Sequence, residues 1–314
     1  MKNQTKNNAW FNFLKVVLIC CSIAFAPSCQ NSRPGTKNRP FRIMFFPNTN
    51  DTLKRSTELI SEYIQKQTKL KVEPIYPVDY LHAAKLFNSK KIDLAFMNNY
   101  SYFLIESKNI GDVHLRVIRG NKTSHKAQII TRSDSGIEKI TDLRYKRVAF
   151  VDRYSISGFV LAASMLIDKN IKVEPYFVGS HLEVVRQVLN KEVDAGSTYV
   201  DSRGTSLPNS IYSVLKSKHK NMQNEVKSII QTAEIPSEPV VLRNGIDQDI
   251  VNKVISALLS LPSEEKYKKA LLKMTGISGF KRASHKDYEL LRKKLNQIKK
   301  HATKYIPGGF KELD

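Results

Sequence analysis

The sequence has little cysteine: Cys20, Cys21 and Cys29 all fall within the first 29 of its 314 residues. The rest of the chain therefore has neither disulfides nor thiol chemistry. Its seven histidines form no H-E-x-x-H motif and no clustered ligand spacing, so we expect no metal site. A G-x-x-x-x-G-K-S/T phosphate loop is also missing, so we expect this chain to hydrolyse no ATP. We also expect no cofactor.

Long hydrophobic runs are scarce as well. The apolar run from Val16 to Ala26 is 11 residues long and follows a basic start, whereas a membrane-spanning helix needs about 20 apolar residues. The run is typical of a signal-peptide core. Ala26 and Ser28 precede Cys29, and this arrangement resembles a bacterial lipoprotein signal, in which Cys29 becomes the first mature residue and is acylated. Ordinary cleavage nearby, which would leave a soluble secreted protein, is the alternative.

These features predict a lipoprotein signal peptide over residues 1–28. Residues 29–40 are polar, contain Pro and Gly, and are predicted to form a flexible tether. We therefore expect a lipid-anchored protein of the cell envelope, either periplasmic or on the outer face of the cytoplasmic membrane.

Acidic residues are few, with 29 Asp and Glu against 51 Lys and Arg, which gives a net charge of +22. Such an excess is the usual signature of a nucleic-acid partner. However, no RRM, KH, zinc-finger or basic-zipper pattern accompanies it, and the lysines are spread along the chain. We interpret them as solvated surface and expect no nucleic-acid partner.

From residue 41 onward, short apolar runs alternate with helical patterns. This alternation is typical of α/β folds in which helices cover mostly parallel sheets. The expected strands are residues 41–46, 72–76, 92–97, 113–118, 127–131, 147–151, 176–178, 195–198 and 240–242. The expected helices include residues 80–88, 248–261, 263–275 and 285–303.

One segment combines a strand, a turn and the start of a helix. Residues 147–151 form the expected strand, and Ser155, Ile156, Ser157 and Gly158 open the helix that follows. The first N–H groups of a helix have no partner and carry a partial positive charge, so they can bind an anion. Serine is also a common N-cap, so this pattern is weak by itself.

The motif DRYSISG at residues 152–158 resembles the D-P-x-S-T-S-G motif of a family of periplasmic proteins. This is the phosphate-, phosphite- and phosphonate-binding (PhnD-like) family of ABC importers. Further motifs follow in the family's order, and together they cover residues 41–295. They are VDYLHAAKLFNSKKIDLAF around residue 80, RSDSGIEKITDL from 132, GSH at 179, VDAG at 193, IPSEPVVLR from 235 and MTGISGF from 274.

The resemblance implies a two-lobed type II periplasmic-binding fold with mixed, mostly parallel sheets. One lobe is expected at residues 41–128 plus 241–314, and the other at residues 129–240. A hinge of two crossing strands is expected near Ile129 and Val240.

The resemblance also implies a binding site. The family's phosphonate cradle falls on Ser155, Ile156, Ser157 and Gly158, with His181 as a further donor. His125 stands where aminophosphonate-binding members have a tyrosine that contacts the ligand.

Two positions of the motif depart from the family pattern. Ile156 replaces the usual Thr, which removes a hydroxyl but keeps the backbone N–H. Arg153 replaces the usual Pro and is a further candidate to reach the anion.

Members that bind aminoalkyl phosphonates hold the amine with an aromatic residue and two carboxylates. The matching residues are Tyr80, Asp201 and Glu238, and these are the groups that an ammonium requires. The alternative is that both acids cap the hinge or pair with lysines.

The predicted function is capture of a phosphonate, with an aminoalkyl phosphonate as one candidate, or of a related phosphorus oxyanion. We expect a monomer without catalytic residues that delivers its ligand to the permease and ATPase of an ABC importer. One alternative is a lipoprotein that presents its ligand to a sensor or binds another oxyanion. A surface phosphoesterase using Ser155, His181 and Asp201 is a weaker alternative, because the G-x-S-x-G elbow is missing.

Overall fold

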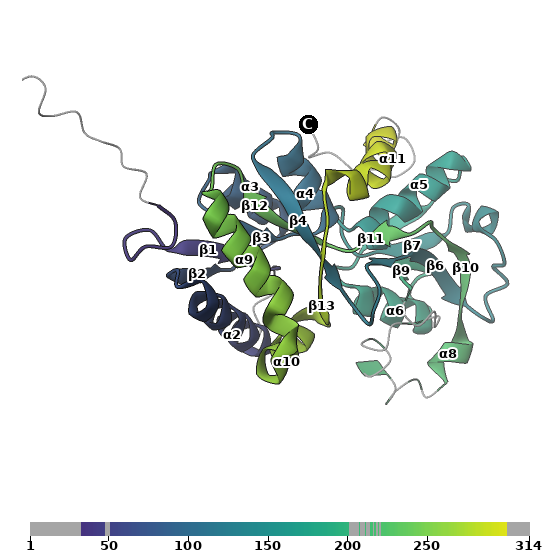
Figure 1. Cartoon of the computed structure of the whole chain (residues 1–314). Coiled ribbons are helices and arrows are strands. Elements are labelled where there is room, and N and C mark those ends of the chain that lie inside the picture. Colours follow the sequence, from purple (N-terminus) through teal and green to yellow (C-terminus); the bar gives the residue numbers. More distant parts are fainter. Residues whose placement is uncertain are drawn as a thin grey trace, which may run out of the picture. The chain divides into compact units, whose positions relative to one another are not determined.

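Two mixed β-sheets organise the protein in the computed structural model (Figure 1). The structure describes residues 33–47, 51–200 and 221–299, together with residues 207, 211, 214, 215, 217 and 219. The predicted signal peptide, Cys29 and Asp201 lie outside the described residues. No helix within the described ranges is both long enough and apolar enough to cross a membrane.

The first sheet has six strands, and its two faces are covered by different helices. One residue of a strand faces one side and the next faces the other, so Ile43 and Met44 enter separate hydrophobic clusters. The strand order is β13 (Gly279–Arg282), β4 (Gly111–Ile118), β12 (Pro239–Arg243), β3 (Leu94–Phe96), β1 (Phe41–Met44) and β2 (Val72–Ile75). The Ile43 face packs on α2 (Asp51–Thr68), α9 (Gln248–Ser260) and α10 (Glu265–Thr275), and the Met44 face on α3 (Tyr80–Asn88) and α4 (Asn99–Glu106).

The second sheet has five strands and is also covered on both faces. Its strand order is β10 (Val226–Gln231), β6 (Ala127–Arg132), β9 (Ala195–Tyr199), β7 (Arg147–Phe150) and β8 (Glu174–Phe177). The short π-helical turn η2 (Ile156–Val160) and α5 (Leu161–Asp168) cover one face, and α6 (His181–Leu189) covers the other. The short helix α8 (Met222–Glu225) directly precedes β10.

The sheets are mixed, as predicted, but they are not mostly parallel. Strand β1 runs parallel to β2 and β3, and β7 runs parallel to β8 and β9. The other described pairings are antiparallel, including those of β12 with β3 and β4 and of β6 with β9 and β10. The prediction of a mostly parallel arrangement was wrong. Strands β4, β6 and β12, which lie next to the passages between the sheets, run antiparallel to their neighbours.

The chain passes from the first sheet to the second after β4 and returns before β12. On the way, β5 (Ser124–His125) pairs with β11 (Ile235–Pro236) in an antiparallel two-stranded sheet. The backbone N–H of Ser237 also donates to the carbonyl oxygen of Thr123 at 2.9 Å. The two passages are therefore hydrogen-bonded to each other along their length.

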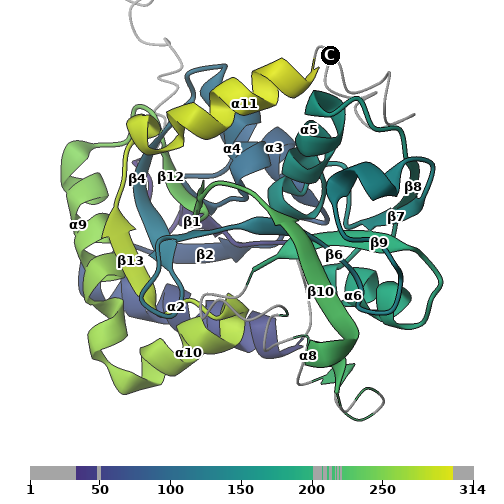
Figure 2. The same ribbon diagram turned by 90° about the vertical axis from the view of Figure 1, so that its right-hand side faces the viewer.

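The last described helix, α11 (Glu289–Lys299), lies against α5 (Figure 2). Its Leu291, Leu295 and Ile298 are buried in a cluster of the second sheet, whereas Tyr288 just before it packs with the first sheet. The apolar stripe predicted on this helix is thus used for packing. The range 241–314 expected for the first lobe includes a helix that packs on the second, and the lobe boundaries stay a prediction.

Residues 34–40, at the end of the predicted tether, are folded onto the first sheet. The carbonyl oxygen of Gly35 accepts the N–H of Lys71 at 2.7 Å. Gly35 has φ +94°, and a Cβ at this position would lie 2.4 Å from Leu70, so only glycine fits. Arg39 binds both carboxylate oxygens of the fully buried Asp93 at 2.8 Å, and Arg243 binds the same carboxylate at 3.0 Å.

Candidate functional site

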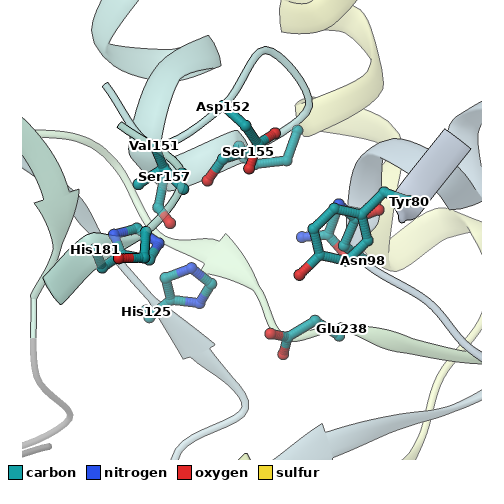
Figure 3. A pocket seen from close by; sticks show the side chains of 13 residues that line it. Tyr80, Asn98, His125, Val151, Asp152, Ser155, Ser157, His181 and Glu238 are labelled. Carbon is teal, nitrogen blue, oxygen red and sulfur yellow. The ribbon is translucent and has the colours of Figure 1, made fainter. Parts of the chain in front are cut away.

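A cavity of about 280 Å³ gathers most of the residues singled out in the sequence. It is lined by helix starts and loops, some packed on the first sheet and others on the second, and Figure 3 shows their side chains. Ser157, His125 and His181 lie on one side of the view, and Tyr80, Asn98 and Glu238 lie on the other. The lining residues are Tyr80, Asn98, Asn99, His125, Val151, Asp152, Ser155, Ile156, Ser157, Gly179, Ser180, His181 and Glu238.

Four helices begin at this cavity. They are α3, α4, α6 and the helical segment that opens with η2, and the first residue of each lines the cavity. Each has an N-cap side chain that accepts a backbone N–H from the first turn; the caps are Asp79, Asn98, Ser155 and Ser180. The other N–H groups of a first turn have no partner within their helix, and each helix adds a partial positive charge at that end. The cavity thus favours an anion, although no Lys or Arg is among its described lining residues.

The η2 turn is held close to strand β7 by Gly158. A Cβ on Gly158 would lie 2.4 Å from Val151 and 2.7 Å from the Ser155 hydroxyl oxygen. That hydroxyl oxygen accepts the N–H of Gly158 at 3.0 Å, so its own proton remains available to a ligand. Gly158 is not among the lining residues, and its part in the predicted cradle is to let Ser155, Ile156 and Ser157 approach the cavity.

The two histidines of the cavity are neutral hydrogen-bonding groups. Burial, with a smaller contribution from the neighbouring His125, lowers the pKa of His181 to about 3. Burial also lowers the pKa of His125. Nδ1 of His181 lies 3.0 Å from Oγ1 of Thr198, and the ring meets Tyr199 edge to face at 4.9 Å. An anion in this cavity would therefore meet imidazoles without a charge.

Tyr80 is held in its neutral form and Glu238 in its charged form. Burial, with smaller contributions from Asp152 and Glu238, raises the pKa of Tyr80 to about 12, so its phenol keeps its proton. Burial acts to raise the pKa of Glu238, but the charge and hydrogen bond of Arg119 outweigh it, and the pKa is lowered. Glu238 forms an ion pair with Arg119, so a cation already occupies the carboxylate that was predicted to bind an amine.

Sequence reasoning missed several residues of the site. Arg119, the partner of Glu238, lies just after β4 and carries no motif of its own. Asn98 and Ser180 are N-caps placed directly before helices, which is a signal that the sequence does contain. Asn98 Nδ2 also donates to the carbonyl oxygen of Tyr154 at 3.4 Å, and this contact between distant segments has no local signal.

Asp152 belongs to the recognised motif but was given no role. Its Oδ1 accepts the N–H of Tyr154 at 2.7 Å, and burial raises the pKa of its carboxyl group. Arg153 does not line the cavity, and its guanidinium stacks over the ring of Phe177 at 4.6 Å. The guanidinium thus lies over Phe177 in this structure, and the expectation that Arg153 reaches the anion stays a prediction.

Asp201, the other acid predicted to bind an amine, lies outside the described residues. Within the described ranges, no three His, Cys, Asp or Glu side chains are grouped so that they could hold a metal ion.

Residues 43–288 match a family described as "ABC transporter, phosphonate, periplasmic substrate-binding protein". The chain belongs to this family. A relative from Mycolicibacterium smegmatis, "Phosphate-import protein PhnD", is 27% identical over 187 residues, which are 52% of this chain and 58% of the relative. The match thus spans less than two thirds of that relative's length. A relative from Prochlorococcus marinus, "Probable ABC transporter phosphite binding protein PhnD1", is 23% identical over 91% of this chain and 99% of its own.

A solved structure of PhnD1 from Prochlorococcus marinus in complex with methylphosphonate has the same fold. It superimposes with a TM-score of 0.66 at 18% identity and covers 83% of this chain and 98% of that chain. Membership in the family and this likeness confirm the predicted two-lobed type II periplasmic-binding fold.

Proposed function

We propose that this protein binds a small phosphorus oxyanion, such as a phosphonate or phosphate, in the cavity and delivers it to an ABC importer. The observation that carries the proposal is the convergence of four helix N-termini on one cavity. Phosphate groups commonly bind at helix N-termini. The family description and the names of the relatives point to the same ligand class.

The energetics are sufficient for such a ligand. Each hydrogen bond to a charged group contributes about 1.5 to 3 kcal/mol, and each helix end about 0.3 to 1 kcal/mol. Four or five such bonds, less the cost of immobilising the ligand, reach the roughly 8 kcal/mol of a micromolar complex. The donors are the hydroxyls of Ser155 and Ser157, the first N–H groups of the helices and His181.

The two passages between the sheets are proposed to act as a hinge. The cavity is lined by helix starts and loops that pack on both sheets, so a ligand would contact both lobes and favour their closed arrangement. A membrane permease would then recognise the closed form.

A thermal-shift series with phosphate, phosphite, methylphosphonate and 2-aminoethylphosphonate tests the binding proposal, with sulfate as the control. A ligand at about 100 times its Kd stabilises the folded state by about 2.7 kcal/mol, which raises the Tm measurably. We expect a rise with at least one phosphorus oxyanion that exceeds the rise with sulfate. No rise with any of the four would contradict the proposal.

The lipid anchor is a separate part of the proposal, and it rests on the sequence around Cys29. Mass spectrometry of the protein extracted from cell membranes should show an acylated N-terminal Cys29. A Cys29→Ser variant should no longer be processed at this position. A mature N-terminus other than Cys29 would overturn the anchor but leave the binding proposal standing.

A further inference from the structure

Arg119 and Glu238 join the two passages between the sheets at the wall of the cavity. Arg119 directly follows β4, and Glu238 directly precedes β12. Nη1 of Arg119 bonds to Oε2 of Glu238, and the backbone N–H of Val117 donates to the carbonyl oxygen of Glu238 at 3.1 Å. Both side chains are largely buried, with 30% and 24% of their surfaces exposed. The ion pair is therefore a partly buried, hydrogen-bonded contact and not an exposed surface contact.

The ion pair reduces the negative charge that an anion would meet in the cavity. Asp152 and Glu238 both line the cavity, so two carboxylates stand where an oxyanion is proposed to bind. Like charges in a poorly solvated site cost several kcal/mol. Arg119 neutralises Glu238, and the pair together presents no net charge to the ligand.

We propose that Arg119 determines which phosphonates this protein accepts. Because it already serves as the counter-ion of Glu238, it selects ligands with an uncharged substituent over ligands that carry an ammonium group. The inference rests on the proposed function and names the ligand class of the same site.

The physical reason is a competition for one carboxylate. An ammonium group that enters the cavity loses its hydration and needs an anionic partner to compensate. At Glu238 it would have to displace a guanidinium, which is planar and weakly hydrated and therefore well suited to a buried ion pair. An uncharged substituent has no such requirement and fits beside Tyr80, whose phenol is protonated.

Isothermal titration calorimetry of the full mature protein with methylphosphonate and 2-aminoethylphosphonate tests the inference. The wild type should bind methylphosphonate more tightly, by roughly tenfold or more. Arg119→Gln uncovers the charge of Glu238, which repels the oxyanion and attracts an ammonium. The affinity ratio should therefore move toward 2-aminoethylphosphonate by roughly tenfold or more.

Three further variants separate this effect from a general loss of structure. Arg119→Lys keeps the positive charge and should keep the preference of the wild type. The double variant Arg119→Gln/Glu238→Gln removes both charges and should restore the preference for methylphosphonate. Arg42→Gln breaks the ion pair of Arg42 with Glu73, outside the cavity, and should not change the ratio. If Arg119→Gln fails to fold, the preference of the wild type between the two phosphonates still tests the inference.

Failure of this inference can be distinguished from failure of the proposed function. A wild type that prefers 2-aminoethylphosphonate would overturn the inference and leave the proposed function intact, as would an unchanged ratio in a folded Arg119→Gln variant. A wild type that binds neither phosphonate, nor phosphate or phosphite, would overturn the proposed function itself.

Discussion

Nδ1 of His181 lies 3.0 Å from Oγ1 of Thr198, and this contact sets the orientation of the imidazole at the cavity. His181 is the first residue of α6, and Thr198 is a fully buried residue of β9. When the Thr198 hydroxyl donates to Nδ1, the ring carries its proton on Nε2 and can donate to a ligand oxygen. The contact thus connects a buried strand residue to the binding of an anion.

Thr198→Val should weaken the binding of a phosphorus oxyanion by about fivefold, since one supporting hydrogen bond is worth about 1 kcal/mol. The shape of the side chain is retained, so the loss should come from the imidazole. Calorimetric titration of wild type and variant with the same ligand measures it. Equal affinities would show that Thr198 does not orient the ring.

The folded protein should lose stability as the pH falls. Burial lowers the pKa of His181 to about 3, whereas an unfolded histidine titrates near pH 6.5. Between these values the unfolded chain binds the proton and the folded protein does not. The free energy of unfolding should therefore fall by up to about 1.4 kcal/mol per pH unit below about pH 6.5.

Urea unfolding at about pH 7 and about pH 5 measures this dependence. His181→Gln should show a shallower loss than the wild type over the same window. Part of the loss should persist in the variant, because burial also lowers the pKa of His125. An identical pH dependence in both proteins would contradict the assignment.

Ser157→Ala should weaken ligand binding by roughly tenfold or more, because it removes a hydroxyl donor that lines the cavity. The matched control is Ser164→Ala in α5. Ser164 is also buried, and its hydroxyl oxygen has no partner among the described residues. The control should retain full affinity in the same titration. If both variants bind like the wild type, Ser157 is not part of the cradle.

Gly158→Ala should disrupt the start of the η2 turn and abolish binding, since its Cβ would lie 2.4 Å from Val151. The control is Gly279→Ala, where the nearest atom to a Cβ is 3.7 Å away. Thermal unfolding with and without ligand separates the two effects. The Gly158 variant should show a lower Tm and no rise with ligand, and an unaltered ligand response would argue against the close packing.

Asp93→Asn should destabilise the protein by about 3 kcal/mol or more, because breaking a buried ion pair leaves charges without compensation. The fully buried carboxylate of Asp93 holds both Arg39 and Arg243. Glu62→Gln, which breaks an exposed pair with Lys266, serves as the control and should cause no measurable change. Urea unfolding measures both variants. If Asp93→Asn is as stable as the wild type, the segment at residues 34–40 contributes little to the free energy of unfolding.

Much of the local structure follows from the sequence. Helix α3 was predicted over its observed residues 80–88, and in the structure Asp79 caps its start. Strand β8 begins two residues earlier than predicted, since the pattern of Glu174 and Pro175 hides its start. The resemblance carried by DRYSISG pointed to Ser155 and Ser157, and both line one cavity with His125 and His181.

The strands, the family motif and the serines that it contains could be predicted from the sequence, because they depend on residues close together in the chain. That four helices begin at one cavity and that Arg119 neutralises Glu238 follows from the tertiary fold alone. Those features depend on the antiparallel pairing of β4 with β12 and on the two passages between the sheets. Local periodicity carries no information on which distant strands pair, so the charge of the site could not be read before the fold was known.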